Sequence, residues 1–290
     1  MNFVELNGHI LSEYDPNIRN INETLDLLKK ASSIGIETIV ETPNSSFLHN
    51  IKFSEIQEKL DDLTSLLTDL EINNMNLLVG IETNLDNDTP KQISLGKSLT
   101  INSTKYLMIK FPYLGLPKNF DTTLRLLNIM GITPILLNLE KNNYILKKPN
   151  FIYELLKENC LIQLSSSNLL SSADKEVREF SQFLIKNHLV HTVSGFVNYN
   201  ISDIEKNLQE IIDFIDFSSD KDSVELLLNT NPNLIAYGNE PKIEIEERQS
   251  TKLKLFFKYP IKKIPNTIEY LHWKTLRIIK FLKIQIKNLQ

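Results

Sequence analysis

Polar side chains that could bind a metal ion or an anion recur just after short, mostly apolar runs of this chain. His9 follows the first such run, Glu82 follows the run 77–81, and Lys110 follows the run 106–109. Imidazole and carboxylate groups are ligands of divalent metals, whereas an ammonium group binds phosphate as a point charge. Amides, which are poor transition-metal ligands, stand after the other runs, at Asn7, Asn44, Asn138 and Asn198.

Strand-like runs alternate with amphipathic helical segments over residues 1–240. The strands are predicted at 38–40, 77–81, 106–109, 134–137, 161–164 and 189–193. The helices are predicted near 24–31 and at 53–71, 121–130, 151–158, 173–187 and 202–216. This α/β alternation indicates a parallel sheet, and six or seven units in about 240 residues favour a closed barrel over an open sheet. Because function lies at the carboxyl ends of barrel strands, the polar residues are expected to gather there.

Composition excludes several classes of protein. The chain has 290 residues and a single cysteine, Cys160, which excludes a disulfide framework and a cysteine-rich zinc site. A lone thiol fits a reducing compartment, so we expect a cytoplasmic protein. No uncharged apolar run reaches 18 residues, so no membrane span is expected. Five histidines are few for an enzyme built on histidine-ligated metals.

The net charge of −4 hides an uneven distribution. Residues 241–290 carry twelve Lys and Arg against four Asp and Glu, which leaves twenty against thirty-two in 1–240. We predict a domain boundary near 238–241, with a barrel over 1–240 and a basic C-terminal extension over 241–290. The extension is predicted to form a hairpin and then an amphipathic helix with one basic stripe: Lys274, Arg277, Lys280, Lys283 and Lys287.

The helix predicted over 265–290 suits an anionic membrane surface. The alternative is an ordinary amphipathic helix that covers the barrel and keeps its lysines in water. No nucleic-acid partner is expected, because the body is acidic and carries no recognised nucleic-acid-binding module.

Several stretches resemble the bacterial tyrosine-protein phosphatases of the CpsB/YwqE type, which belong to the PHP (polymerase and histidinol phosphatase) superfamily. The resemblance covers roughly residues 1–240 and is carried by the stretches 8–11, 35–42, 131–135, 138–140, 189–191 and 231–235. It implies a distorted, TIM-like (βα)7 barrel. It also implies a centre of three Mn²⁺-type ions that activates water to hydrolyse phosphotyrosine on a membrane tyrosine autokinase, in capsule or exopolysaccharide biosynthesis.

The sequence departs from this family at most of the metal-ligand positions. The opening His-x-His becomes Asn7-Gly8-His9, two further histidines become Asn44 and Asn138, and a glutamate becomes Lys110. The late Asp-x-His becomes Phe196-Val197-Asn198, and an arginine after Asn138 becomes Lys141. His9 and Glu82 are the residual metal positions, and Asp15 is a candidate for an early aspartate.

Electrostatics indicates how severe these changes are. An ammonium group at Lys110, ~4 Å from a divalent ion, is repelled by roughly 8 kcal/mol at an effective dielectric constant of ~20. We therefore predict that the metal centre is lost, that no cofactor is bound, and that hydrolysis is absent or residual; Mn²⁺ is expected only if part of the centre survives. Lys110 and Lys141 could then hold phosphate without cleaving it, as in a pseudophosphatase that binds phosphotyrosine or the kinase.

Plainer interpretations stand beside this one. Glu82 and Lys110 could form a salt bridge in place of the metal, and Glu140 and Lys141 could be ordinary loop charges. His9 could be a hydrogen-bonded residue near a strand end. At the level of function, the alternatives are an active metal-dependent phosphatase with a rebuilt site, and a structural scaffold or homo-oligomer. Kinase binding would place the protein at the inner face of the membrane.

Overall fold

The computed structural model describes residues 2–11, 14, 20–45, 53–85, 88–95 and 100–242. Asp15 and the hairpin and helix predicted beyond residue 242 lie outside the described residues. The described part belongs to one compact unit that spans Met1–Glu246. The domain boundary near 238–241 stays a prediction.

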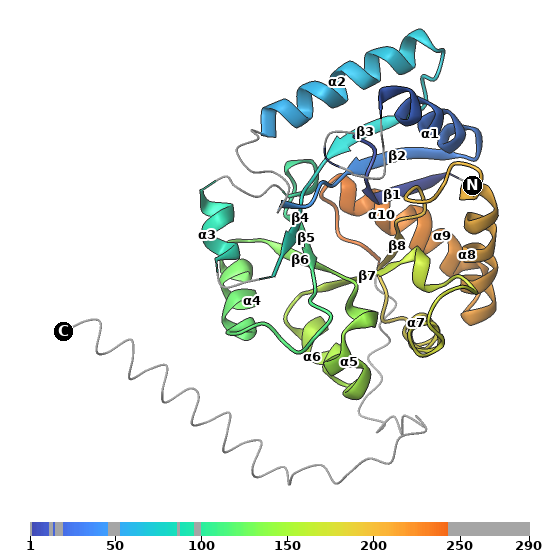
Figure 1. Ribbon diagram of the computed structural model, residues 1–290. Coiled ribbons are helices and arrows are strands. Elements are labelled where there is room, and N and C mark those ends of the chain that lie inside the picture. The colour runs from blue at the N-terminus through green and yellow to red at the C-terminus, as the bar shows by residue number, and fades with distance from the viewer. Residues whose placement is uncertain are drawn as a thin grey trace, which may run out of the picture. The chain divides into compact units, whose positions relative to one another are not determined.

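Eight parallel strands form the centre of the fold (Figure 1). A three-stranded sheet has the order β1-β2-β3, formed by Phe3–Gly8, Ile36–Glu41 and Asn76–Val79. A five-stranded sheet follows in the order β4 to β8, formed by Glu82–Asn84, Tyr106–Lys110, Thr133–Leu137, Leu161–Ser165 and Thr192–Ser194. The strands are parallel, and strands that are consecutive in the sequence are neighbours in each sheet, which confirms the α/β class of the fold.

The two sheets are continuous through short contacts, which close a distorted barrel. Glu82 forms a parallel bridge with Asn44, and its N–H donates to Pro43 O at 3.1 Å. At the other edge, Leu6 N donates to Ser194 Oγ at 3.3 Å, so β1 meets β8 through a side chain instead of a backbone ladder. Only two residues separate β3 from β4, so the two occupy one strand position, and the fold agrees with the distorted barrel of seven strand positions that was predicted.

Two strand predictions are wrong in detail. The run 77–81 is not one strand, because the chain breaks at Gly80-Ile81 and continues as β4. Glycine weakens a strand interior and permits such a bend. The run 189–193 is only partly extended, since β8 begins at Thr192. Glu82 therefore begins a strand, although the sequence suggested that it follows one.

Ten helices are found among the described residues, and most lie where the apolar periodicity predicts them. They comprise α1 (Ile21–Ser33), α2 (Phe53–Asp69), α3 (Thr89–Ser94), α4 (Phe120–Ile129), α5 (Asn143–Lys147), α6 (Phe151–Lys157), α7 (Lys175–Lys186), α8 (Ile204–Ser218), α9 (Lys221–Glu225) and α10 (Asn231–Ala236). A π-helical turn over Leu226–Thr230 joins α9 to α10. In Figure 1 the helices surround the strands, and α2 lies outermost, beside β3. No helix in this part of the chain is long and apolar enough to cross a membrane.

The apolar core and the segment after α10 fill the amino-terminal part of the barrel, and polar residues lie at the carboxyl end. Val4, Leu6, Tyr106 and Met108 belong to the core, together with residues of α10. Tyr106, the first residue of β5, donates its hydroxyl to Asn239 O at 2.8 Å, so the segment after α10 lies at the amino-terminal end of the barrel. Because side chains alternate along a strand, Lys110 occupies the next core-facing position of β5 after Tyr106 and Met108, at the carboxyl end.

Candidate functional site

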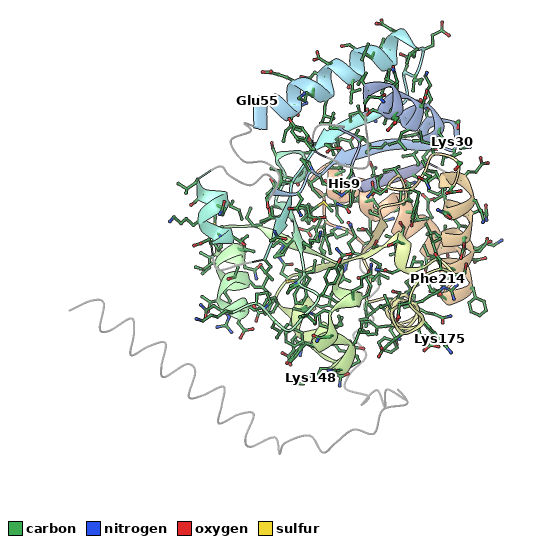
Figure 2. All side chains as sticks on the ribbon, viewed as in Figure 1. His9, Lys30, Glu55, Lys148, Lys175 and Phe214 are labelled. Carbon is green, nitrogen blue, oxygen red and sulfur yellow. The ribbon has the colours of Figure 1, made fainter. Side chains whose placement is uncertain are left out.

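The ends of β1 and β8 bring three of the predicted site residues together. Asn198 donates from Nδ2 to Asn7 O at 2.9 Å and accepts at Oδ1 from His9 N at 3.2 Å. Asn198 is exposed, whereas Asn7 and His9 are half-buried. Figure 2 shows His9 beside the strands, whereas Lys30, Glu55, Lys148 and Lys175 lie toward the outside. Hydrogen bonds between the Asn198 amide and the backbone thus link the segment after β8 to the end of β1.

Three more of the predicted residues meet after the end of β2, at the start of β4 and at the end of β5. Lys110 Nζ lies 3.0 Å from Glu82 Oε1, and Asn44 Nδ2 donates to the same oxygen at 2.7 Å. The Glu82 side chain is 6% exposed and that of Lys110 is 35% exposed. The predicted salt bridge between Glu82 and Lys110 is therefore confirmed, and the carboxylate is held by protein groups.

Thr42 connects the two groups of residues. Asn7 donates from Nδ2 to Thr42 Oγ1 at 2.8 Å, and Thr42 in turn lies two residues before Asn44 on the same strand end. The hydroxyl of Thr42 also contacts Gly8 O at 3.3 Å. Six of the predicted positions thus form one polar network, at the carboxyl ends of β1, β2, β5 and β8 and at Glu82, the first residue of β4.

The end of β6 contributes Asn138 and Lys141 beside this surface. Lys110 pairs with Leu137 across the β5–β6 ladder, and Asn138 follows Leu137 with φ 59°, a left-handed conformation that asparagine tolerates. Lys141 follows within a 3₁₀ turn and is half-buried. The structure places both lysines on neighbouring strand ends.

Glu140 is not a loop charge, and that interpretation was wrong. Its side chain is fully buried. The carboxylate accepts hydrogen bonds from Ser165 N at 2.9 Å and from Asn168 Nδ2 at 2.5 Å, and so fastens the end of β7 to that of β6. Burial raises the pKa of Glu140, and the two hydrogen bonds oppose this rise.

A second buried carboxylate, Glu5, was missed entirely. Its oxygens accept the backbone N–H groups of Gly195 and Phe196, at 2.8–2.9 Å, and that of Asn7 at 2.7 Å. Burial raises the pKa of Glu5 to about 7, against the lowering effect of these hydrogen bonds. A charged residue inside the apolar run 3–6 was the available sequence signal. Gly195 lies 190 residues away and Phe196 lies 191 residues away, so the run alone could not identify these partners.

Phe196 does not face an open site. Its side chain is fully buried, and its backbone N–H is one of the groups that Glu5 accepts. The neighbouring Tyr199 exchanges a hydrogen bond with Ser166, with 2.8 Å between their oxygens. Burial raises the pKa of Tyr199 to about 12, so it is a neutral hydroxyl at pH 7. The strand ends are therefore rich in amide and hydroxyl groups.

The residues of this site do not fit a cluster of divalent metal ions. Within the described ranges, no group of three His, Cys, Asp or Glu side chains could hold a metal. Glu82 contacts an ammonium and an amide instead, and Glu5 and Glu140 accept backbone N–H groups. The neutral amides of Asn7, Asn44 and Asn198 are poor ligands for a transition metal. The arrangement can hold an anion through a lysine, amides and hydroxyls.

Fold and site together define a parallel α/β barrel whose strand ends carry a lysine, a glutamate and amides. The chain belongs to the CpsB/CapC family of capsular polysaccharide synthesis, whose model matches residues 3–236.

Individual relatives support this assignment. CapC of Staphylococcus aureus is 30% identical over 194 residues, which cover 66% of this chain and 75% of that protein. The tyrosine-protein phosphatase YwqE of Bacillus subtilis is 24% identical over 193 residues, covering 66% and 76%. A solved structure described as that of YwqE and of CpsB from Streptococcus pneumoniae, metal-dependent tyrosine phosphatases, superposes with a TM-score of 0.75. It covers 83% of this chain and 97% of that one at 22% identity, a likeness that concerns the fold.

Proposed function

We propose that this protein is a degenerate capsular tyrosine phosphatase that binds phosphotyrosine at the barrel mouth and does not hydrolyse it efficiently. The observation that carries the proposal is the ion pair between Lys110 and Glu82, at 3.0 Å, among the former ligand positions. A cation at this point repels a divalent ion and attracts a phosphate dianion. The same substitution therefore disfavours hydrolysis and favours binding.

The exposure of the two partners supports this role. Glu82 is nearly buried, so its charge keeps the ammonium group at the strand ends, whereas Lys110 is about one-third exposed and can meet a ligand. Lys141 on the adjacent strand end adds a second cation. Amide and hydroxyl donors around them, such as those of Asn7 and Ser165, can complete the coordination of phosphate oxygens.

The proposed partner is a membrane tyrosine autokinase or its phosphotyrosine-bearing tail. Membership in a capsule-synthesis family with tyrosine-phosphatase relatives supports this choice. The protein would then act in the cytoplasm, at the inner face of the membrane where such a tail lies.

Binding is tested by titration calorimetry with free phosphotyrosine and with a phosphotyrosine peptide. We expect Lys110→Met to weaken both by roughly tenfold or more, because a charge-assisted contact is lost. Lys175→Met is the matched control, since Lys175 is also paired with a glutamate but is 89% exposed on α7. Equal affinities for the wild type and Lys110→Met would contradict the role of Lys110.

Catalysis is tested by elemental analysis and phosphotyrosine turnover with added Mn²⁺. Near-stoichiometric metal and robust turnover would instead support an active phosphatase with a rebuilt site, for which the retained His9 and Glu82 are the favouring residues. A variant that combines Lys110→Glu and Phe196→Asp with four Asn→His changes, at Asn7, Asn44, Asn138 and Asn198, tests whether the barrel supports the chemistry. Absence of both binding and turnover would support a scaffold, and the oligomeric state would then be the next measurement.

A further inference from the structure

The loop between β5 and α4 exposes two large side chains directly after Lys110. Tyr113 is 52% exposed and Leu114 is 77% exposed, three and four residues beyond the lysine. A loop that follows a strand in this barrel lies at the carboxyl end, which is the end of the candidate site. Contiguous exposed apolar surface marks interaction sites, whereas single exposed apolar side chains are ordinary; Tyr113 and Leu114 are adjacent in the chain.

Hydrogen bonds hold this loop in one conformation. Asn142, which is fully buried, donates from Nδ2 to Pro112 O at 2.6 Å and to Gly115 O at 2.7 Å. Asn143 N donates to Tyr113 O at 3.0 Å, and Gly115 N donates to Asn143 Oδ1 at 2.9 Å. The backbone on both sides of Leu114 is therefore fastened to the start of α5.

Aromatic rings pack against one another beside this loop. Phe111 packs edge-on against Phe120 with ring centroids 5.6 Å apart, and Phe120 lies 6.0 Å from Phe151. Phe151 in turn contacts Tyr144 of α5 at 5.4 Å. Phe111 and Phe120 are almost fully buried, whereas Phe151 and Tyr144 are half-buried. A fixed support means that little conformational entropy is lost when Tyr113 and Leu114 are covered.

We infer that Tyr113 and Leu114 form a specificity surface that contacts an apolar side chain near the phosphotyrosine of the bound peptide. The inference rests on the proposed function, because Lys110 supplies the anion contact. The Cα atoms of Lys110 and Leu114 are joined by four peptide steps and lie at most ~15 Å apart. An extended peptide advances ~3.3 Å per residue, so the contacted side chain lies within about four residues of the phosphotyrosine.

The combination of a cation and an adjacent apolar surface points to this occupant. A phosphate alone would satisfy Lys110 and leave Leu114 in water, whereas a peptide with an apolar neighbour satisfies both. This surface should therefore affect the affinity for the peptide without affecting the affinity for the phosphate group alone. An aliphatic residue fits better than a charged one, because the loop exposes one aromatic ring and one isobutyl group.

The test compares a phosphotyrosine peptide that has leucine three residues from the phosphotyrosine with one that has serine there, and with free phosphotyrosine. We expect the leucine peptide to bind the wild type roughly tenfold more tightly than the serine peptide. Leu114→Ser should abolish that preference and leave the affinity for free phosphotyrosine unchanged. Tyr113→Ser should reduce the preference in the same direction.

Ile129→Ser is the matched control, because Ile129 is 81% exposed at the opposite end of α4. A leucine preference that survives Leu114→Ser, or that Ile129→Ser removes equally, would overturn this inference while binding through Lys110 stands. Failure of both peptides and of free phosphotyrosine to bind the wild type would overturn the proposed function together with it.

Discussion

At the scale of single residues, the mouth of the barrel is organised by buried carboxylates that bind protein groups. Glu5 accepts N–H groups from the segment after β8, and Glu140 accepts one from the end of β7. Glu82 instead contacts the ammonium of Lys110. A carboxylate that already accepts fixed donors is poorly placed to coordinate a metal ion, so its function here is to fasten strand ends to one another.

Glu5 should make stability depend on pH. Its folded-state pKa of about 7 lies above the ordinary glutamate value, so its stabilising contribution is complete at low pH and is lost as pH rises toward 7. We expect Glu5→Gln to gain stability relative to wild type between pH 5 and pH 8, by up to roughly 3 kcal/mol. Urea unfolding at both pH values measures this difference.

The comparison with Glu5→Gln is needed because a second group acts in the opposite direction. Burial lowers the pKa of His191 to about 4, so its contribution is lost as pH falls from about 6.5 toward 4. The wild-type profile combines both effects, whereas the difference between the two proteins isolates Glu5. A difference that is constant between pH 5 and pH 8 would show that Glu5 ionises normally.

At the scale of elements, the close approach of β1 to β2 depends on Gly8. A Cβ at this position would lie 2.4 Å from Ile39 Cγ2 and 3.2 Å from Val40 O. Gly8 also separates Asn7 from His9, so any displacement of β1 would move both residues. The small residue is therefore required by packing at the point where the site begins.

Gly8→Ala should accordingly destabilise the protein by about 1–3 kcal/mol, because the strands must separate to admit the methyl group. Gly131→Ala provides the contrast: nothing lies within 4 Å of its added Cβ, and the cost is only that of a left-handed backbone at φ 74°, about 1 kcal/mol. Chemical denaturation of the two variants measures both costs. A smaller loss for Gly8→Ala than for Gly131→Ala would refute the packing argument.

Local pattern predicted the elements better than the contacts between them. Period-two and helical spacing identified most strands and helices, because each depends on neighbours in the sequence. The break at Gly80-Ile81 was not predicted, since the run 77–81 contains no polar side chain that would mark it. Glu5 and Glu140 were not recognised as buried groups, because their donors come from other strand ends. The pair of Glu82 and Lys110 was predicted because a known family geometry placed both residues at one site.

At the scale of the whole molecule, Asn231 determines where the barrel ends. This fully buried residue accepts Lys242 N at 2.7 Å and donates to Lys242 O at 3.1 Å, and it also donates to His191 O. Lys242 is thus fastened to the residue that precedes β8. The unit needs the chain through Lys242, slightly beyond the boundary that the change in charge predicts.

A chain that ends at Lys242 should therefore fold cooperatively, with a melting temperature close to that of the full-length protein. It should also lose binding to vesicles that contain phosphatidylserine, because the five basic residues on one side of the helix predicted over 265–290 would be absent. Each lysine or arginine near an anionic surface contributes ~1 kcal/mol, so with five of them the full-length protein should bind roughly 4,000-fold more tightly at low salt. Vesicle co-sedimentation at low and high salt measures this; equal binding by both chains would mean that the extension has no role at the membrane and covers some other surface.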